Sequence, residues 1–367
     1  MHQDHSHEIV FAVKQRNMDE LTRILHDVSD PTSNNYGQHL SRDEVLALTS
    51  NPESCETIAK YLELSGASVT SQTSGGEYIT ARAPIAVWEV MLNTEFFLYD
   101  MRHKNNEVEE VVRTERYWIP NELDAHVTGL FNTVDMPIRS GSVHPVLELQ
   151  ADRKAQSRFS TMGDYGVTSP RKIRAYYNMG TSKGSIASRQ AIYAANQDYL
   201  SPNDVRLFQN DKTLNVQAPI IVNGYANDSM CYSNQDACSE SNLDVQYIMA
   251  SSPESPTQYW HSSEGMYLWF RTLLNTVDVP LVVSISYGIS EKFLSSFYQN
   301  EFTGWAIKMG VRGITIFVAS GDDGANDPAV RNNNTRNCGY APTWPAVNPY
   351  VTAVGATSVS TVISLYL

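Results

Sequence analysis

Two acidic residues in the stretch 238–247 are spaced so that they could do chemistry together. Glu240 and Asp244 are four residues apart, which places both side chains on one face of a helix. Two carboxyl groups so close together raise the pKa of one of them and can share a proton, as general acid–base catalysis requires. The alternative is a solvated helix face on which two like charges repel each other.

A third acidic residue follows an apolar run. The stretch 313–318 predicts a buried strand, and the sequence Ala-Ser-Gly-Asp at 319–322 turns directly after it. Asp322 in that turn could ligate a metal ion or, when protonated, donate a hydrogen bond to a developing oxyanion. Turn formation alone would also favour Asp and Gly at these positions.

The strand predicted at 279–285 ends in Ser286, Tyr287 and Gly288. Residues of this kind could let a substrate backbone lie along a strand edge, although an ordinary core strand explains them equally well. Eight of the nine histidines precede residue 147, and only His261 follows it. A hydrolase built on the second half of the chain would therefore more economically use a carboxylate as its base.

Two regions of different pattern must position these residues. From Glu8 to about Val134, helices and alternating strands are mixed, which predicts a compact α+β domain. From Ile173 onward, strands rich in Val and Ile alternate with helical stretches, which predicts a mostly parallel, doubly wound α/β sheet. The strands are expected at 190–194, 220–222, 279–285 and 313–318, and the helices at 203–208, 241–250, 265–275 and 290–308.

Between these regions the periodicity lapses into Gln, Arg, Lys, Ser, Gly and Pro. Such a composition marks an exposed linker, where proteases cut. The predicted boundaries are a first domain at 8–146, a linker at 147–172 and a second domain at 173–367.

Composition narrows the function. The 367 residues include 40 acidic and 27 basic ones, for a net charge of −13, and no basic block of the kind that nucleic-acid binding needs. No apolar run is long enough to cross a bilayer, and the first residues lack the features of a signal peptide. Two glycosylation sequons, at Asn227 and Asn333, and two cysteines in one short loop, Cys231 and Cys238, nevertheless suit an oxidising compartment, so we expect secretion or lysosomal delivery.

The four cysteines allow three disulfide pairings, which sequence alone does not distinguish. Cys231 and Cys238 lie close together and form the local candidate pair. Cys55 and Cys338 are isolated, without ligating histidines nearby, so we do not expect a structural zinc site.

Together, these motifs resemble the sedolisin family, the serine-carboxyl peptidases that include tripeptidyl peptidase. The matches are Glu-x-x-x-Asp at 240–244, Ser-Ile-Ser-Tyr-Gly at 284–288, Ala-Ser-Gly-Asp at 319–322 and the stretch 345–357. The first domain, with Asn-Tyr-Gly-Gln-His-Leu-Ser at 35–41, looks like the activation prodomain of that family. The resemblance covers nearly the whole chain.

The resemblance implies a subtilisin-like α/β catalytic domain that cleaves peptides or proteins. Glu240 would be the base to a serine, Asp244 would orient Glu240, and Asp322 would donate a proton to the oxyanion. Because such a site needs protonated carboxyl groups, activity is expected at acid pH. The prodomain would be an intramolecular inhibitor, blocking the cleft until the linker is cut.

One departure from the family bears on activity. The family's nucleophile lies in a Gly-Thr-Ser-Ala-Ser type of motif, far downstream of the turn that corresponds to Ala-Ser-Gly-Asp here. A helix and a calcium site follow that motif in the family. The near match in this chain ends in Ser358, and the β-branched residues after it disfavour the helix that would support a nucleophile. We therefore expect a carboxyl-truncated chain without the nucleophile or the calcium ligands, and an incomplete sheet whose exposed edge causes poor solubility.

The leading hypothesis is thus an acid-acting serine-carboxyl peptidase made as a zymogen, with this chain unable to hydrolyse peptides. One alternative is a non-catalytic, prodomain-bearing protein that binds or inhibits related peptidases. A second alternative is an active enzyme that uses Ser358.

Overall fold

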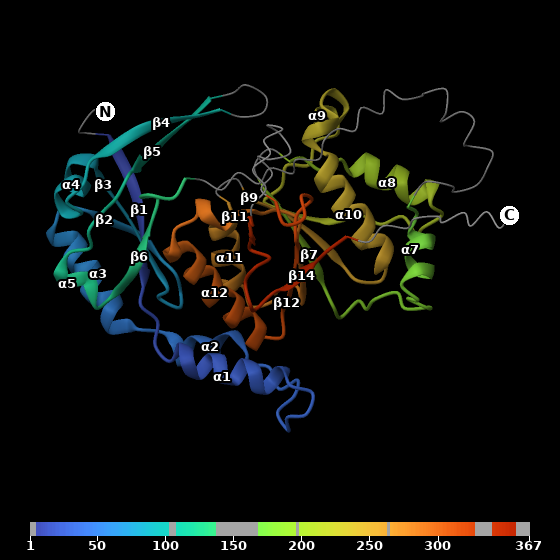
Figure 1. Ribbon diagram of the computed structural model, residues 1–367, viewed down its shortest axis with the longest axis horizontal. Helices are drawn as coiled ribbons and strands as arrows, with labels where there is room; N and C mark the ends of the chain where they lie inside the picture. Colours follow the sequence, from blue (N-terminus) through green and yellow to red (C-terminus); the bar gives the residue numbers. More distant parts are fainter. Residues whose placement is uncertain are drawn as a thin grey trace.

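The computed structural model describes residues 5–102, 108–136, 168–195, 198–262, 265–326 and 340–356. These residues form an N-terminal region, residues 5–136, and an α/β region, residues 168–356, which lie next to each other (Figure 1). Most of the predicted linker falls within 137–167, outside the described residues.

The N-terminal region has the mixed α+β architecture that the sequence predicts. Its sheet has the order β2-β3-β1-β6 and is antiparallel throughout, with β4 and β5 forming a separate hairpin. The strands are β1 (Ser6–Val13), β2 (Ser68–Gln72), β3 (Tyr78–Pro84), β4 (Phe96–Arg102), β5 (Val108–Thr114) and β6 (Val127–Phe131). The helices are α1 (Met18–Ser29), α2 (Arg42–Thr49), α3 (Pro52–Leu64), α4 (Ile85–Met91) and α5 (Asn121–Asp124).

Local sequence sets where these helices begin. Ser41 and Glu44 form a complete capping box at the start of α2, which satisfies two backbone N–H groups that the helix cannot pair. Asn51 caps α3, with Pro52 in its first turn, where the missing N–H of proline costs nothing.

The α/β region is built on one parallel sheet of six strands in the order β14-β12-β10-β7-β9-β8. The sheet strands are β7 (Gln190–Ala195), β8 (Ile220–Val222), β9 (Thr257–Ser262), β10 (Val282–Ile285), β12 (Thr315–Ala319) and β14 (Thr352–Val354), and β11 (Ile289–Ser290) pairs with β13 (Thr343–Trp344). The helices are α7 (Pro170–Tyr176), α8 (Pro202–Asp211), α9 (Asp228–Ser233), η1 (Gln235–Ala237), α10 (Ser239–Ser251), α11 (Met266–Asn275), η2 (Glu291–Phe293) and α12 (Ser296–Val311). The predicted parallel α/β class is confirmed.

Strand β9 and helix α12 are two of the elements that differ from the sequence prediction. Strand β9 was not expected, because Thr-Gln-Tyr-Trp-His-Ser has no run of Val and Ile, yet all six of its residues are buried beside β7. Helix α12 begins at Ser296 rather than at 290, because β11 and η2 occupy the residues before it and Ser295 caps the helix.

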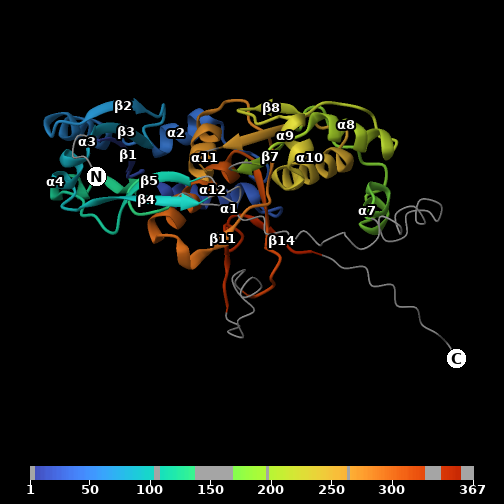
Figure 2. The same cartoon turned by 90° about the horizontal axis from the view of Figure 1, so that it is seen from above.

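The side chains of β7 alternate between two apolar clusters, one on each face of the sheet. Ala191 and Tyr193 face the cluster that includes α11 and α12, whereas Ile192 and Ala194 face the cluster of α8 and α10. Figure 2 shows α8, α9 and α10 on the side away from the N-terminal region.

One face of the N-terminal sheet packs on α11 and α12, and the other face packs on α3 and α4. Ile9 and Phe11 of β1 pack with α3 and α4, whereas Val10 and Ala12 belong to the core of the α/β region. This double burial explains why β1 is apolar at consecutive positions instead of alternating.

Candidate active site

The acidic pair lies on α10, the helix that the sequence predicts at 241–250. Glu240 in its first turn is 4% exposed, so the pair does not lie on a solvated helix face. The Asp244 residue as a whole is half-buried, but its Oδ2 atom is buried and lacks a hydrogen-bond partner among the described residues. An ionised carboxylate in this position would be costly.

Burial raises the pKa of Asp244 well above its usual range, and the negative charges of Glu240 and Asp198 raise it further. A hydrogen bond from Ser286 acts in the opposite direction but does not reverse the shift. The charged form of a carboxyl group is disfavoured by low dielectric and by like charges. The pair therefore retains a proton to higher pH than an isolated carboxyl group would.

The predicted substrate-binding residues follow β10, whose pairing with β7 and β12 stops at Ile285. The Ser286 hydroxyl donates a hydrogen bond of 2.9 Å to Asp244 Oδ1. Tyr287 is 2% exposed, and a side chain at Gly288 would meet the Trp344 carbonyl oxygen at 2.8 Å. Because these side chains face the protein, the backbone of 286–288 is the part that a substrate could contact.

Asp322 lies in the turn after β12 and is exposed. Because β10 and β12 run parallel, Ser286 and Asp322 follow strands that end at the same edge of the sheet. Parallel α/β proteins bind their ligands at this carboxyl edge.

Sequence reasoning missed Asp198, which follows β7 at the same edge. Its Oδ2 accepts a hydrogen bond of 2.8 Å from the Tyr287 hydroxyl, and its backbone carbonyl accepts one of 2.7 Å from the Tyr259 hydroxyl. The signal that could have found it was its position four residues after the strand predicted at 190–194, the kind of position that carries site residues in parallel sheets.

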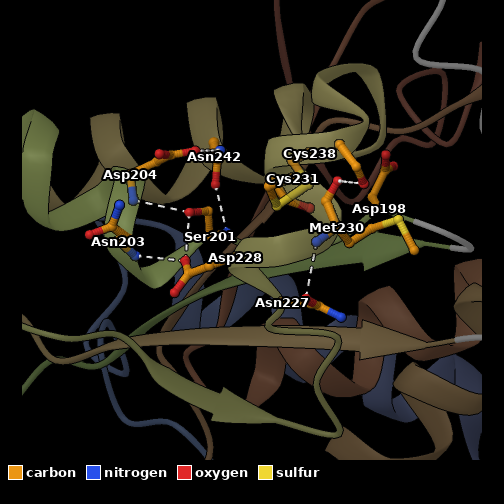
Figure 3. The surroundings of a disulfide bond; sticks show 12 residues. Asp198, Ser201, Asn203, Asp204, Asn227, Asp228, Met230, Cys231, Cys238 and Asn242 are labelled. Atoms are coloured by element: carbon orange, nitrogen blue, oxygen red, sulfur yellow. Dashed lines mark hydrogen bonds between the residues drawn. A yellow bond between two sulfur atoms is a disulfide. The ribbon is translucent and has the colours of Figure 1, made fainter.

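Cys231 and Cys238 form a disulfide that joins α9 to the residue before α10. Hydrogen bonds around it tie α8 and α9 together: Asp228 Oδ1 accepts from the Ser201 hydroxyl and from the backbone N–H of Asn203 (Figure 3). Asn242 of α10 also donates to Asp204 Oδ2 in α8. The start of the helix that carries Glu240 is thus held from several sides.

The structure describes some of the remaining residues that the sequence analysis singled out, but not all of them. Asn227, one of the two glycosylation candidates, is exposed, and its side-chain oxygen caps α9 by accepting from the Met230 N–H. His261 is buried, 4.2 Å from the ring of Tyr225. The positions that lie outside the described residues are Asn333, Cys338 and Ser358.

Calcium is a cofactor of the family that the sequence resembles. Within the described ranges, no group of three or more His, Cys, Asp or Glu side chains could hold a metal ion. In the same ranges, no helix is long and apolar enough to cross a membrane.

Comparison with known proteins bears on both regions. The family model "Pro-kumamolisin, activation domain" matches residues 1–136. Tripeptidyl-peptidase 1 of Canis lupus familiaris is 28% identical over 95% of this chain, and that of Pongo abelii is 29% identical over the same share. A Pseudomonas sedolisin, a serine-carboxyl proteinase solved with pseudo-iodotyrostatin, aligns over 50% of this chain and 52% of its own, with 18% identity and a TM-score of 0.40.

The chain therefore combines a region similar to an activation domain with a parallel α/β domain that carries a buried acidic pair. Over nearly its whole length the chain is similar to tripeptidyl-peptidase 1, and its first 136 residues match the activation-domain family. The chain spans 61% of the length of these tripeptidyl-peptidase relatives.

Proposed function

We propose that this protein is an acid-acting serine-carboxyl peptidase of the zymogen type, whose substrates are peptides or proteins. The observation that carries the proposal is the buried Glu240–Asp244 pair, in which Asp244 keeps its proton to unusually high pH and accepts a hydrogen bond from Ser286. Buried pairs of this kind supply a general acid and a general base from one site.

In this proposal, Glu240 removes the proton of an attacking serine hydroxyl and returns it to the leaving amine. Asp244 orients Glu240, and neutral Asp322 donates a hydrogen bond to the oxyanion of the tetrahedral intermediate. The backbone of 286–288 binds the substrate. Turnover at acid pH is part of this proposal, because general acid catalysis by carboxyl groups needs a carboxyl that carries its proton.

The sequence contains no match to the Gly-Thr-Ser-Ala-Ser motif of the family nucleophile. We therefore propose that residues 1–367 supply the carboxyl groups of the site but neither the serine nor the calcium ligands. Ser358 is not the nucleophile in this proposal.

The N-terminal region acts as an intramolecular inhibitor in this proposal, in keeping with its match to an activation domain. The proposed units are a prodomain at 8–146, a processed linker at 147–172 and a catalytic domain at 173–367. The Cys231–Cys238 disulfide and the exposed Asn227 sequon support passage through the secretory pathway, and hence a secreted or lysosomal protein.

The test is to express the chain and cut it within the linker with an added protease. Peptide binding and peptide hydrolysis are then measured near pH 4, about the ordinary pKa of a carboxyl group. We expect peptide binding that Glu240→Ala weakens, without turnover. Hydrolysis abolished by Ser358→Ala would show that the nucleophile is present after all. Absence of peptide binding would refute the peptidase assignment.

A second candidate is an inhibitor of related peptidases, which the close packing of the N-terminal sheet on α11 and α12 favours. The isolated fragment 8–134 would then inhibit a full-length tripeptidyl peptidase. No inhibition at micromolar concentration would exclude this candidate.

A further inference from the structure

Asp198 is fixed beside the acidic pair by two tyrosines from neighbouring strands. Tyr287, directly after β10, donates its hydroxyl to the Asp198 carboxylate, and Tyr259 of β9 donates its hydroxyl to the Asp198 carbonyl. Both rings are buried, at 2% and 0% exposure. Two rigid donors therefore hold the side chain and the backbone of one acidic residue at the carboxyl edge of the sheet.

The same tyrosines bring Asp198 into the electrostatic environment of α10. The charges of Asp198, Asp244 and Glu240 all contribute to a pKa of Tyr287 well above its usual range, after burial as the largest cause. The Tyr287 hydroxyl thus stays neutral, and its hydrogen atom is directed to Asp198. It does not satisfy the buried Oδ2 of Asp244, which keeps no partner among the described residues.

Three elements contribute groups that interact with Asp244. Glu240 comes from α10 itself, the Ser286 hydroxyl from the end of β10, and Asp198 from the connection after β7. Of these, Glu240 and Asp198 are carboxyl groups whose negative charge would raise the pKa of Asp244. Three carboxyl groups in one poorly solvated region cannot all be ionised at modest cost, so one proton must be retained among them.

We infer that Asp198 is a positioning residue of the carboxyl site: anchored by Tyr287, its negative charge keeps the shared proton on the Glu240–Asp244 pair. This inference rests on the proposed function, because the retained proton matters for catalysis only if the Glu240–Asp244 pair acts as a general acid and base. Asp198 itself contacts neither a serine nor a substrate in this scheme.

The experiment measures the proton directly, without relying on peptide hydrolysis. The full chain is labelled with aspartate that carries carbon-13 in its carboxyl group, and the infrared band of protonated carboxyl groups is followed as a function of pH. The component that disappears in Asp244→Asn identifies the pair and separates it from other buried acids. We expect Asp198→Asn to lower the pH midpoint of this component, because the substitution removes a nearby negative charge that favours the protonated form.

A second variant covers a failure of Asp198→Asn to fold. Tyr287→Phe keeps the ring but removes the hydroxyl that holds the Asp198 carboxylate near the pair, so the midpoint is again expected to fall. Asp228→Asn is the matched control, because Asp228 also accepts two hydrogen bonds at this end of the molecule but does not act on Asp244. The pH midpoint of the Asp244 component in the Asp228→Asn variant should equal that of the unmodified chain. Circular dichroism verifies that each variant is folded.

Unchanged midpoints in both Asp198→Asn and Tyr287→Phe would overturn the inference, as would an equal shift in the Asp228→Asn control. The proposed function fails on a different result, namely the absence of peptide binding. A chain that binds no peptide could still show the shift, and a chain that binds peptide could lack it.

Discussion

At the scale of single residues, Asp244 decides the chemistry of the site. A carboxyl group with a raised folded-state pKa binds its proton more tightly in the native state than in the unfolded state. Folding stability therefore falls as pH rises from the ordinary aspartate value, near 4, towards the raised native value. The residue is retained at a cost in stability, as is common for groups at functional sites.

Asp244→Asn is consequently expected to stabilise the protein at pH 7, because the amide mimics the protonated form without its cost. The gain should be on the order of 1 kcal/mol for each unit by which the pKa is raised, and it should vanish below about pH 4. Denaturant unfolding at the two pH values measures it. Asp228→Asn should instead lower the stability at pH 7, because that carboxylate accepts hydrogen bonds. A loss of stability in Asp244→Asn at pH 7 would contradict this account.

At the scale of elements, the placement of α10 depends on the short segments before it. The disulfide closes the loop from Cys231 to Cys238 over α9 and η1, and the Ala237 carbonyl accepts a hydrogen bond from the Tyr199 N–H after β7. Glu240 follows Cys238 by only two residues. A local cross-link thus restrains the start of the helix that carries the acidic pair.

Replacing both cysteines, in Cys231→Ser/Cys238→Ser, should lower the free energy of unfolding by about 2.5 kcal/mol, the chain-entropy value for a loop of this length. Denaturant unfolding measures the loss. A reductant should reproduce it in the unmodified chain and in Cys55→Ser, since Cys55 is a free thiol, but not in the double variant. Equal stability of the double variant and the unmodified chain would show that the disulfide is dispensable.

At the scale of the whole molecule, buried charges join the two regions. Glu77 of the N-terminal region pairs with Lys308 of α12 at 3.2 Å, and both side chains are 4% exposed. Glu301 of α12 accepts hydrogen bonds of 2.8 and 2.9 Å from the hydroxyls of Tyr78 and Thr128. These groups line a cavity of about 700 Å³ between the regions.

The two carboxyl groups respond to acid in opposite directions. Burial acts to raise the pKa of Glu77, but the Lys308 charge and hydrogen bonds outweigh it, so that pKa is lowered overall. Its contribution to docking is therefore present above the ordinary glutamate value and is lost as pH falls through the native value. Burial raises the pKa of Glu301, whose protonation on acidification relieves a cost instead.

Glu77→Gln should weaken docking of the N-terminal region by about 3–5 kcal/mol at neutral pH, because it removes the carboxylate that pairs with the buried Lys308. Small-angle X-ray scattering on the intact chain should then show a larger radius of gyration at pH 7, whereas the unmodified chain expands only on acidification. Glu77→Gln/Lys308→Met should restore most of the compactness and weaken the acid response. If Glu77→Gln stays compact at pH 7, the ion pair does not hold the regions together.

Much of the fold and part of the site could be predicted from the pattern of neighbouring residues in the sequence. The Glu240–Asp244 spacing, the helix around it and the strands at 190–194, 220–222 and 313–318 depend on periodicity, which adjacent residues determine. The paired cysteines are separated by only seven positions, so their proximity is also a local property.

Tertiary structure alone decided which side chains meet. Strand β9 has no Val or Ile run and is a strand because β7 and β8 pair with it on either side. Asp198 and Tyr287 lie 89 residues apart and meet only because β7 and β10 are adjacent parallel strands. Periodicity in the sequence predicts that a residue is buried, but it does not predict which residue packs against it. The order of the strands in the sheet determines those contacts, and it therefore determines which carboxyl groups lie close enough to share a proton.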